Sequence, residues 1–365
     1  MESKALVGIA DKCVRGFPDW ASVTPSSITV SVVSGGLTNQ IYLCRRPAAG
    51  GPADAASGTP TEVLVRVFGE GTEELVDREA ELEFLELVSA EGIGPRCLGC
   101  FEGGRVEQFV PDARTWHVRD LRDPARAALL GAAMAKLHAI ELPSKHSRLA
   151  ADTSLAKSLA AGAWPATAQK AANALVARGG RRGLLAAAVD VPALAQECVW
   201  LMGFLADLES PVVFCHNDLQ EGNVLELKDG SVTVLDYEFG GNNFRGFDFG
   251  NLFCEMVMDN QGTAFPGFVC QPDCYPDREA QLGFFRAYAP AADDAALEKL
   301  MAEADAFAMA SHLYWALWAV AQGLNSQIVW GYLEYAQQRS VQYHACKERA
   351  LRAAGRGYEV GETFL

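Results

Sequence analysis

The stretch HNDLQEGN, from His216 to Asn223, and the run VTVLDYE, from Val232 to Glu238, decide how this chain is interpreted. The first has the spacing H-x-D-x-x-x-x-N, and the second predicts a β-branched strand that ends at Asp236. Asp and Asn in a loop before a strand often act only as turn formers that bond their own backbone. The full spacing, followed by a strand and a second acid, favours a functional site over that structural explanation.

This arrangement is the skeleton that protein-kinase-like enzymes share. Phosphoryl transfer from ATP needs a carboxylate that positions the attacking hydroxyl and accepts its proton, and it needs oxygen ligands for Mg²⁺. We expect Asp218 to be the catalytic carboxylate. We expect Asn223 and Asp236 to be the metal ligands, and Gln220 to order the catalytic loop or the departing phosphate.

The same region resembles the signature of choline/ethanolamine kinases. The resemblance continues through the segments NFRGFD at 243–248 and NLFCE at 251–255, and it extends with gaps from about Ser34 to Gln342. It implies an α+β, bilobal protein-kinase-like fold, with a small antiparallel-sheet N-lobe and a larger, mainly helical C-lobe.

The activity implied by this resemblance is transfer of the γ-phosphate of Mg-ATP to choline, giving phosphocholine. That reaction is the first step of phosphatidylcholine synthesis by the CDP-choline route. An ethanolamine or dual-specificity kinase remains an alternative, and less favoured ones are an aminoglycoside-type phosphotransferase and an inactive scaffold.

On the bilobal fold that the resemblance implies, the chain is expected to divide into an N-terminal helical extension (1–23), an N-lobe (24–111) and a C-lobe (112–365). The amphipathic extension could cover the small lobe or serve a subunit contact, and the sequence does not choose between these roles. Within the N-lobe, the Pro-, Ala- and Gly-rich segment 46–61 is expected to be a flexible insertion. Strands are predicted at 28–33, 40–44 and 62–69, and a helix from about Glu73 to Ala90.

The nucleotide site is expected in the N-lobe. A glycine-bearing turn lets backbone N–H groups approach phosphate oxygens, although hairpins also use such turns without a ligand. Arg66, on the third strand, matches the position at which protein kinases place a lysine, and Glu79 on the following helix is its candidate ion-pair partner. Gln108 and Val110 lie in the segment that resembles the family's link to the adenine. The predicted phosphate-binding turn consists of Ser34, Gly35, Gly36, Leu37, Thr38 and Asn39.

Aromatic residues in the last helices are candidates for holding the acceptor. Choline carries a permanent charge and no N–H donor, so cation–π attraction, electrostatics and shape must bind it. Asn260 stands where choline kinases commonly carry a tyrosine, and Phe265 or Phe268 could replace that wall. The resemblance assigns Trp315, Trp318 and Tyr335 to the ammonium site. The predicted acceptor site also includes Asp218, Glu238, Glu255 and Trp330.

Composition limits the partners and the compartment. A formal charge of −15 over 365 residues argues against nucleic acid or an anionic membrane as the partner. Ten cysteines without a signal peptide indicate reduced thiols and a cytoplasmic protein. The apolar run Ala306–Ala321 is too short to span a bilayer and predicts a buried helix, and a homodimer is left open.

Overall fold

The computed structural model describes residues 2–33, 39–47, 59–68, 78–143, 145–146 and 150–353. The chain forms two compact units. The N-terminal unit contains Met1–Arg114 and Leu225–Phe239, and the C-terminal unit contains Thr115–Val224 and Gly240–Leu365. The predicted lobe boundary near residue 111 therefore omits the segment 225–239, which returns to the N-terminal unit and carries Asp236.

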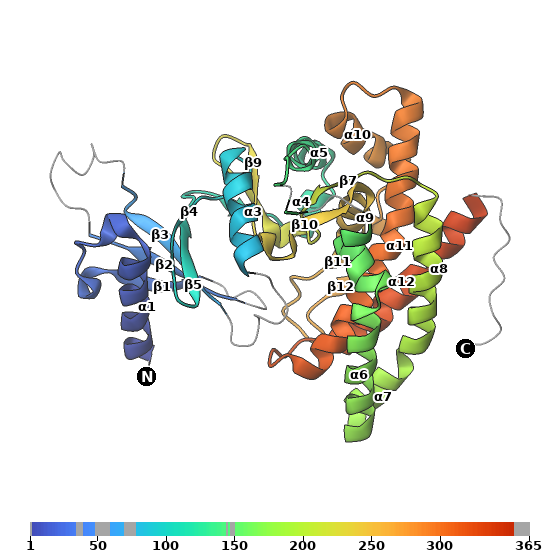
Figure 1. Cartoon of the computed structure of the whole chain (residues 1–365), viewed down its shortest axis with the longest axis horizontal. Coiled ribbons are helices and arrows are strands. Elements are labelled where there is room, and N and C mark those ends of the chain that lie inside the picture. Colours follow the sequence, from blue (N-terminus) through green and yellow to red (C-terminus); the bar gives the residue numbers. More distant parts are fainter. Residues whose placement is uncertain are drawn as a thin grey trace. The chain divides into compact units, whose positions relative to one another are not determined.

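The N-terminal unit is built on a five-stranded antiparallel sheet (Figure 1). Its strand order is β1-β2-β3-β5-β4, with Arg66 of β3 directly opposite Arg105 of β5. The strands predicted at 28–33, 40–44 and 62–69 are confirmed with small shifts of their ends. The strands are β1 (Thr29–Val33), β2 (Asn39–Arg45), β3 (Glu62–Phe68), β4 (Cys97–Phe101) and β5 (Gly104–Gln108).

Helix α1 (Glu2–Gly16) packs against this sheet, as Figure 1 shows in dark blue. Its residues Ile9 and Cys13, with Phe17 just beyond it, share one apolar core with Val65 and Val106 of the sheet. The N-terminal extension thus covers the small unit, which was one of its two predicted roles.

The rest of the N-terminal unit adds one helix and a hairpin. Helix α3 (Arg78–Ala90) carries four buried residues, Glu81, Phe84, Leu85 and Val88, on one face. The predicted hairpin after Asn223 is present, since β8 (Val224–Glu226) and β9 (Val232–Val234) are neighbours in a sheet with β6 (Arg114–Thr115). A 3₁₀ turn, η7 (Tyr237–Phe239), follows Asp236.

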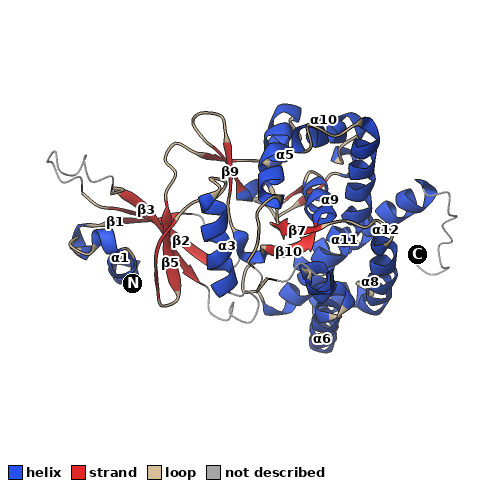
Figure 2. Cartoon of the chain, turned by 45° about the horizontal axis from the view of Figure 1, so that its top comes forward, coloured by secondary structure: helices blue, strands red, loops and turns tan. Residues whose placement is uncertain are grey.

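The C-terminal unit is mainly helical, with its helices packed around α11 (Figure 2). Several helices begin at an aspartate whose side chain accepts a backbone N–H, such as Asp123 from Arg126 at 2.9 Å and Asp293 from Ala296 at 2.8 Å. The helices are α4 (Val118–Leu121), α5 (Pro124–His138), α6 (Ala163–Arg178), α7 (Gly180–Ala188), α8 (Val191–Ala206), α9 (Arg245–Glu255), α10 (Arg278–Tyr288), α11 (Asp294–Asn325) and α12 (Tyr332–Ala353).

Short elements complete the unit. Two antiparallel pairs form, β7 (Val212–Cys215) with β10 (Gly241–Phe244) and β11 (Met258–Asp259) with β12 (Val269–Cys270). The 3₁₀ turn η6 (Glu221–Asn223) ends the predicted catalytic loop, which β7 introduces. The remaining turns are η1 (Pro18–Trp20), η2 (Pro25–Ser27), η4 (Ala150–Asp152), the π-helical turn η5 (Ala156–Ala160) and η8 (Pro272–Cys274).

Helix α11 is the core of the C-terminal unit, because the run Ala306–Ala321 is buried throughout, as predicted. Helix α9 lies against it at very short range. A Cβ at Gly250 would lie 2.4 Å from the backbone nitrogen of Ala308, so only glycine permits this approach.

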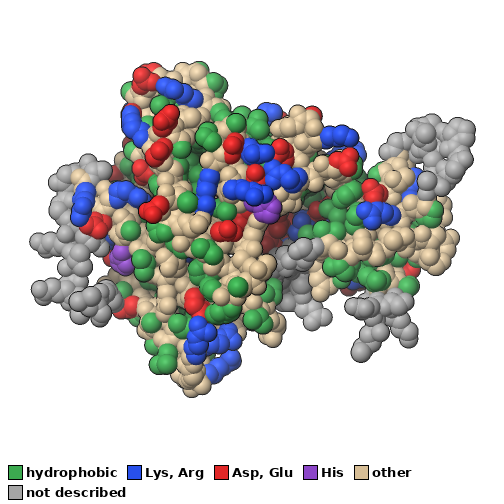
Figure 3. Space-filling view, turned by 180° about the vertical axis from the view of Figure 1, so that it is seen from behind, with side chains coloured by type: hydrophobic (Ala, Val, Ile, Leu, Met, Phe, Trp, Pro, Cys, Tyr) green, Lys and Arg blue, Asp and Glu red, His purple; other side chains and the backbone are tan. Residues whose placement is uncertain are grey.

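One stretch, Gly180–Ala206, is long and apolar enough to cross a membrane by length and composition alone. In the structure it is divided into α7 and α8 by Val189 and Asp190, and Asp190 caps α8 by accepting the Ala193 N–H at 3.0 Å. On the face drawn in Figure 3, acidic and basic side chains are interspersed over the helical unit.

Candidate active site

The predicted phosphate-binding turn, Ser34 to Thr38, lies outside the described residues. Asn39 is the first residue of β2, and its side chain is also outside the description. The nucleotide side of the site is therefore examined from Arg66 onward.

Arg66 is buried on β3 and is held by two carboxylates of its own unit. Its Nε donates to Glu107 Oε1 at 2.8 Å, and one terminal nitrogen donates to Asp236 Oδ1 at 3.1 Å. The predicted phosphate-binding arginine and the predicted metal ligand Asp236 are thus direct neighbours. Asp236 has a backbone φ of 63°, a left-handed conformation that few non-glycine residues adopt.

The predicted ion pair of Arg66 with Glu79 is wrong. Glu79 is exposed, and the buried acid of α3 is Glu81, two residues later, which bonds Arg78 at 2.7 Å and Arg105 at 2.8 Å. The inward face of α3 runs through 81, 84, 85 and 88, and Glu79 lies outside it.

Glu107 joins the two arginines that face each other across the sheet. Its Oε1 accepts from Arg66 and, at 2.6 Å, from the Nε of Arg105. Burial alone would raise the pKa of Glu107, but the two guanidinium groups lower it to about 2. The carboxylate therefore stays charged, and it offsets the repulsion expected between like charges on facing strands.

Gln108, in the segment predicted to contact the adenine, is already hydrogen-bonded to Arg96. The backbone N–H of Gln108 donates to Arg96 O at 2.8 Å, and its side-chain oxygen faces the Arg96 N–H at 3.3 Å. Val110 lies in the following loop and is partly exposed. Glu238, expected near the acceptor, belongs to this N-terminal unit and lies 3.8 Å from Arg78.

The catalytic loop in the C-terminal unit is ordered by its own side chains. Asp218 is partly exposed, and its backbone N–H donates to His216 Nδ1 at 3.2 Å. The side-chain amide of Asn223 donates to the Asp218 carbonyl oxygen at 2.8 Å. Gln220 caps η6 by accepting the Gly222 N–H at 2.9 Å. The loop geometry therefore depends on the residues of the motif itself.

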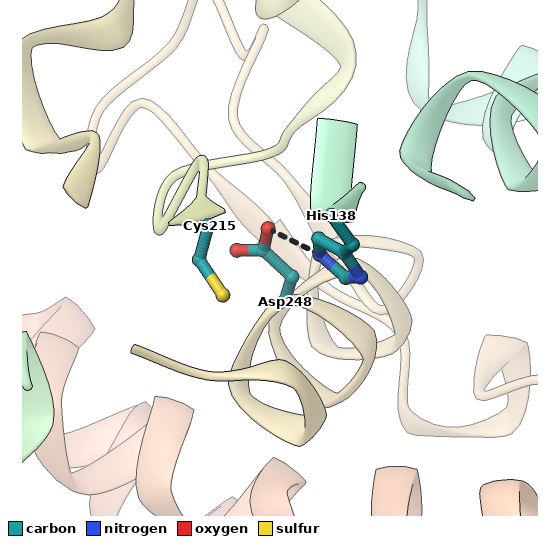
Figure 4. Close-up of side chains that lie close together, drawn as sticks. All are labelled: His138, Cys215 and Asp248. Carbon is teal, nitrogen blue, oxygen red and sulfur yellow. Dashed lines mark hydrogen bonds and ion pairs between the residues drawn. The ribbon is translucent and has the colours of Figure 1, made fainter. Parts of the chain in front are cut away.

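Asp248 anchors the start of this loop, and Figure 4 shows its carboxylate near Cys215 and hydrogen-bonded to His138. Its two oxygens accept the backbone N–H groups of His216, at 2.8 Å, and Asn217, at 2.7 Å. Asn217 has a φ of 67°, so the carboxylate stabilises a left-handed turn immediately before Asp218. His138 Nε2 lies 3.1 Å from Asp248 Oδ2, and its Nδ1 lies 3.0 Å from the Tyr288 hydroxyl.

Cys215 completes a buried group in which potential metal ligands of His138, Cys215 and Asp248 lie within 4.8 Å of one another. Both oxygens of Asp248 already accept hydrogen bonds. Burial, with the Asp248 charge, raises the pKa of the Cys215 thiol well above its ordinary value, whereas a metal needs the thiolate. The group therefore serves as a hydrogen-bonded anchor of the loop.

The aromatic residues predicted to bind the acceptor form one continuous cluster in the C-terminal unit. Ring centroids of successive members lie 4.9–5.9 Å apart. Burial raises the pKa of the Tyr335 hydroxyl, and the carboxylates of Glu255 and Asp218 add to this shift. Asp218, the predicted catalytic residue, is therefore within electrostatic reach of the cluster. In order of contact the members are Tyr314, Trp315, Trp318, Tyr332, Trp330, Tyr335 and Phe268.

Two phenylalanines were predicted as replacements for the tyrosine that is absent at position 260, and of these Phe268 belongs to the aromatic cluster. Its ring lies 5.2 Å from Tyr335 and 5.4 Å from Trp330, whereas Phe265 is 55% exposed. Asn260, the residue that departs from the family pattern, donates its amide N–H to Glu255 at 2.9 Å.

Glu255 is paired with a residue that the sequence did not indicate. Arg339 of α12 is fully buried and donates to both the Glu255 carboxylate and the Tyr335 hydroxyl. Its guanidinium carbon also lies 4.9 Å from the centre of the Tyr335 ring. The negative charge predicted to attract the acceptor is thus balanced by an internal cation that occupies one face of Tyr335.

A second buried acid, Glu221, lies beside this pair. Burial, followed by the charges of Glu255 and Asp259, raises the pKa of Glu221 to about 8. Neither of its carboxylate oxygens has a hydrogen-bond partner among the described residues. Glu221 is therefore mostly neutral at pH 7, and it adds little to the negative potential of the acceptor side.

Comparisons with known proteins identify the family of this chain. A family model described as choline/ethanolamine kinase matches residues 30–344. A choline/ethanolamine kinase of Mus musculus is 34% identical over 338 residues, covering 88% of this chain and 80% of that protein. A probable ethanolamine kinase of Arabidopsis thaliana is 32% identical over 342 residues, covering 92% and 84%.

A solved structure of choline kinase from Cryptosporidium parvum Iowa II has a TM-score of 0.76 to this chain at 23% identity, with 97% of each chain covered. That similarity shows the fold, which is the predicted protein-kinase-like one. From the family match over most of its length and the identity to curated relatives, the chain belongs to the choline/ethanolamine kinase family, a family of ATP-dependent kinases.

Proposed function

We propose that this protein is a choline kinase that transfers the γ-phosphate of Mg-ATP to the hydroxyl of choline. The observation that carries the proposal is the aromatic cluster beside the catalytic loop, because a quaternary ammonium offers no N–H donor and is held by aromatic faces. Trp315 and Trp318, one helical turn apart, stand with ring centroids 5.3 Å apart at 82°.

Asp218 is the catalytic residue in this proposal. It positions the choline hydroxyl and accepts its proton as the oxygen attacks phosphorus. Its carboxylate is also the nearby negative charge on the acceptor side that favours a cation, because Glu255 is neutralised by Arg339. Gln220 and Asn223 keep the loop in the conformation that presents Asp218.

On the nucleotide side, Arg66 neutralises phosphate charge. Glu107 and Asp236 orient its guanidinium group, which is the role first expected of Glu79. Because Arg66 is fixed by two carboxylates and cannot turn to another partner without breaking a buried ion pair, its position is set before the nucleotide binds.

Asn223 and Asp236 fit the role of magnesium ligands. One Asp236 oxygen bonds Arg66, and the side chain keeps 26% of its surface exposed. The Asn223 amide nitrogen is used on Asp218, which leaves the amide oxygen as a ligand atom. Oxygen donors of this kind suit Mg²⁺, whose chemistry here is neutralisation of the phosphate charge.

Ethanolamine is the alternative acceptor, since cation–π binding serves both ammonium types and the relatives include both kinds of kinase. The segments QEG at 220–222 and RGFD at 245–248 resemble the choline-preferring branch, whereas ELVDR at 74–78 resembles ethanolamine kinases. We favour choline on that balance. A cytoplasmic location is part of the same proposal.

The deciding experiment is release of ADP measured with choline, ethanolamine and kanamycin side by side. The proposal expects the highest kcat/KM with choline. A higher value with ethanolamine would move the assignment to the alternative, and turnover of kanamycin alone would assign an aminoglycoside-type enzyme. If ADP is released with none of the three acceptors, the kinase assignment is overturned.

A further inference from the structure

Asn251, on α9, makes one hydrogen-bonded bridge between the aromatic cluster and the catalytic loop. Its Oδ1 accepts from Trp315 Nε1 at 2.7 Å and from the Ser311 hydroxyl at 2.8 Å. Its Nδ2 donates to the backbone oxygen of Leu219 at 3.4 Å. The residue is completely buried, so these contacts are shielded from competing water.

The helices bring these groups together through a close backbone approach. Glycines at 246 and 250 let α9 lie against α11, since a Cβ at either position would clash with Phe307 or with the backbone of Ala308. Ser311 and Trp315 are one turn apart on α11 and face the same side of the helix. Asn251 directly follows Gly250, and its side chain contacts both Ser311 and Trp315.

The two ends of the bridge belong to the two halves of the acceptor site. Leu219 directly follows Asp218, the residue proposed to take the hydroxyl proton. Trp315 is one of the aromatic walls proposed to hold the ammonium group. A tryptophan with its only N–H committed to a buried acceptor has lost its freedom to rotate, so the position of its ring face is tied to the backbone beside Asp218.

We propose that Asn251 is a positioning residue that sets the distance between the catalytic carboxylate and the ammonium-binding face, and thereby selects acceptors with two carbons between hydroxyl and ammonium. The inference rests on the proposed function. Its physical basis is that a reacting hydroxyl must be held within a few tenths of an ångström of its productive position, and a longer acceptor bound at the same face carries the hydroxyl past Asp218.

A purely structural Asn251 would behave differently. Loss of the bridge would then lower stability and reduce turnover of every acceptor by a similar factor. A role in spacing instead changes the ratio of kcat/KM between acceptors of different length, because only the geometry between the two ends is altered. That ratio is the readout that separates the two roles.

The test compares choline with its three-carbon homologue, 3-hydroxypropyl-trimethylammonium, in wild type and three variants. Asn251→Ala removes the bridge, and Trp315→Phe cuts it at the aromatic end while keeping a ring and most of the packing. Ser311→Ala is the matched control, because it removes a hydrogen bond to the same Asn251 oxygen and leaves the bridge between Trp315 and Leu219 in place. Thermal unfolding of each variant is measured beside the kinetics.

We expect the preference for choline over the homologue to fall by about tenfold or more in Asn251→Ala and in Trp315→Phe, mainly through a lower kcat with choline. Ser311→Ala should keep the wild-type ratio even if it melts earlier. Should Asn251→Ala fail to fold, Asn251→Ser takes its place, because Trp315→Phe also changes the proposed ammonium-binding face. An unchanged ratio in a folded, active bridge variant overturns the spacing role alone, whereas a wild type inactive on every amino alcohol overturns the proposed function with it.

Discussion

The carboxylate of Glu255 is paired with the guanidinium group of Arg339, and both side chains are buried in the C-terminal unit. The other Glu255 oxygen accepts from Asn260, and Arg339 also bonds the Tyr335 hydroxyl. The acceptor side of this kinase thus contains its own cation. A cationic acceptor must therefore be attracted by negative charge other than that of Glu255.

Removing Arg339 should therefore be costly. Arg339→Met leaves the Glu255 carboxylate buried without its partner, and we expect the free energy of unfolding to fall by about 3–5 kcal/mol. Replacing both residues, as Arg339→Met with Glu255→Leu, should recover most of this loss, because the uncompensated charge is gone. Urea unfolding of wild type, both single variants and the double variant gives the coupling energy.

Arg352→Met, on the same helix, is the control. Arg352 is 75% exposed and pairs with Glu348 one turn away, so this change should cost no more than about 0.5 kcal/mol. Equal losses for Arg339→Met and Arg352→Met would show that the buried pair is not important for stability.

The sequence predicted the catalytic loop because its spacing is local. Gln220 and Asn223 hydrogen-bond within the loop from His216 to Asn223, and the hairpin that follows has the Asp-Gly turn that sets its register. The hydrogen bonds that Asp248 and Asn251 add from α9 were not predicted. The small sheet and the buried run Ala306–Ala321 were equally visible as local patterns of apolar residues.

The partners of the charged residues could not be predicted in the same way. Arg66 meets Glu107 because β3 pairs with β5 in one register, a relation between residues 41 positions apart that no single-strand pattern contains. Glu79 was assigned to the inward face of the helix, whereas the buried face of α3 carries Glu81, and a shift of two residues turns a helix face by more than half a turn.

Arg339 was missed for a related reason. The segment YAQQRS, from Tyr335 to Ser340, has the polar composition of an exposed helix face, yet packing of α12 on α11 buries its arginine. Asn251 was recognised as part of the family signature, but no role was predicted for it, because its contact with Trp315 joins two different helices.

Asp218→Ala should reduce turnover with choline by about 10²–10⁴-fold, because the group that accepts the hydroxyl proton is lost. The ADP-release assay measures this effect, and circular dichroism with urea unfolding should show an intact fold. Asp207→Ala, an exposed acid at the end of α8, is the control and should keep full activity. Near-normal rates in Asp218→Ala would remove Asp218 from the catalytic role.

Trp318→Leu should raise KM for choline by about 5–30-fold, which corresponds to a cation–π contribution of about 1–2 kcal/mol. KM for ATP should stay unchanged, and Trp318→Phe should lie between wild type and the leucine variant because it keeps an aromatic face. Steady-state kinetics with each substrate varied in turn measures the difference.

Trp200 provides the matched tryptophan control. It stacks on Phe204 with ring centroids 5.3 Å apart and lies on α8 rather than in the aromatic cluster. Trp200→Leu should leave KM for choline unchanged. If Trp318→Leu weakens choline and ATP equally, Trp318 is a packing residue rather than part of the ammonium site.

The lowered pKa of Glu107 predicts how the stability of the N-terminal unit depends on pH. Burial raises its pKa, but Arg66 and Arg105 outweigh burial and lower it from 4.5 to about 2, a shift that corresponds to about 3 kcal/mol. Because the folded-state pKa lies below the unfolded one, this stability is fully present above about pH 4.5 and is lost as the pH falls toward 2.

Glu107→Gln tests that assignment. At pH 7 it should lower the free energy of unfolding by about 3–5 kcal/mol, because Arg66 and Arg105 lose a shared buried partner. The difference from wild type should then shrink between pH 4.5 and 2, as wild-type Glu107 itself becomes protonated. Glu102→Gln, at an exposed acid in the turn between β4 and β5, should follow the wild-type curve. A difference between Glu107→Gln and wild type that stays constant across this range would mean that the carboxylate charge does not hold the two arginines together.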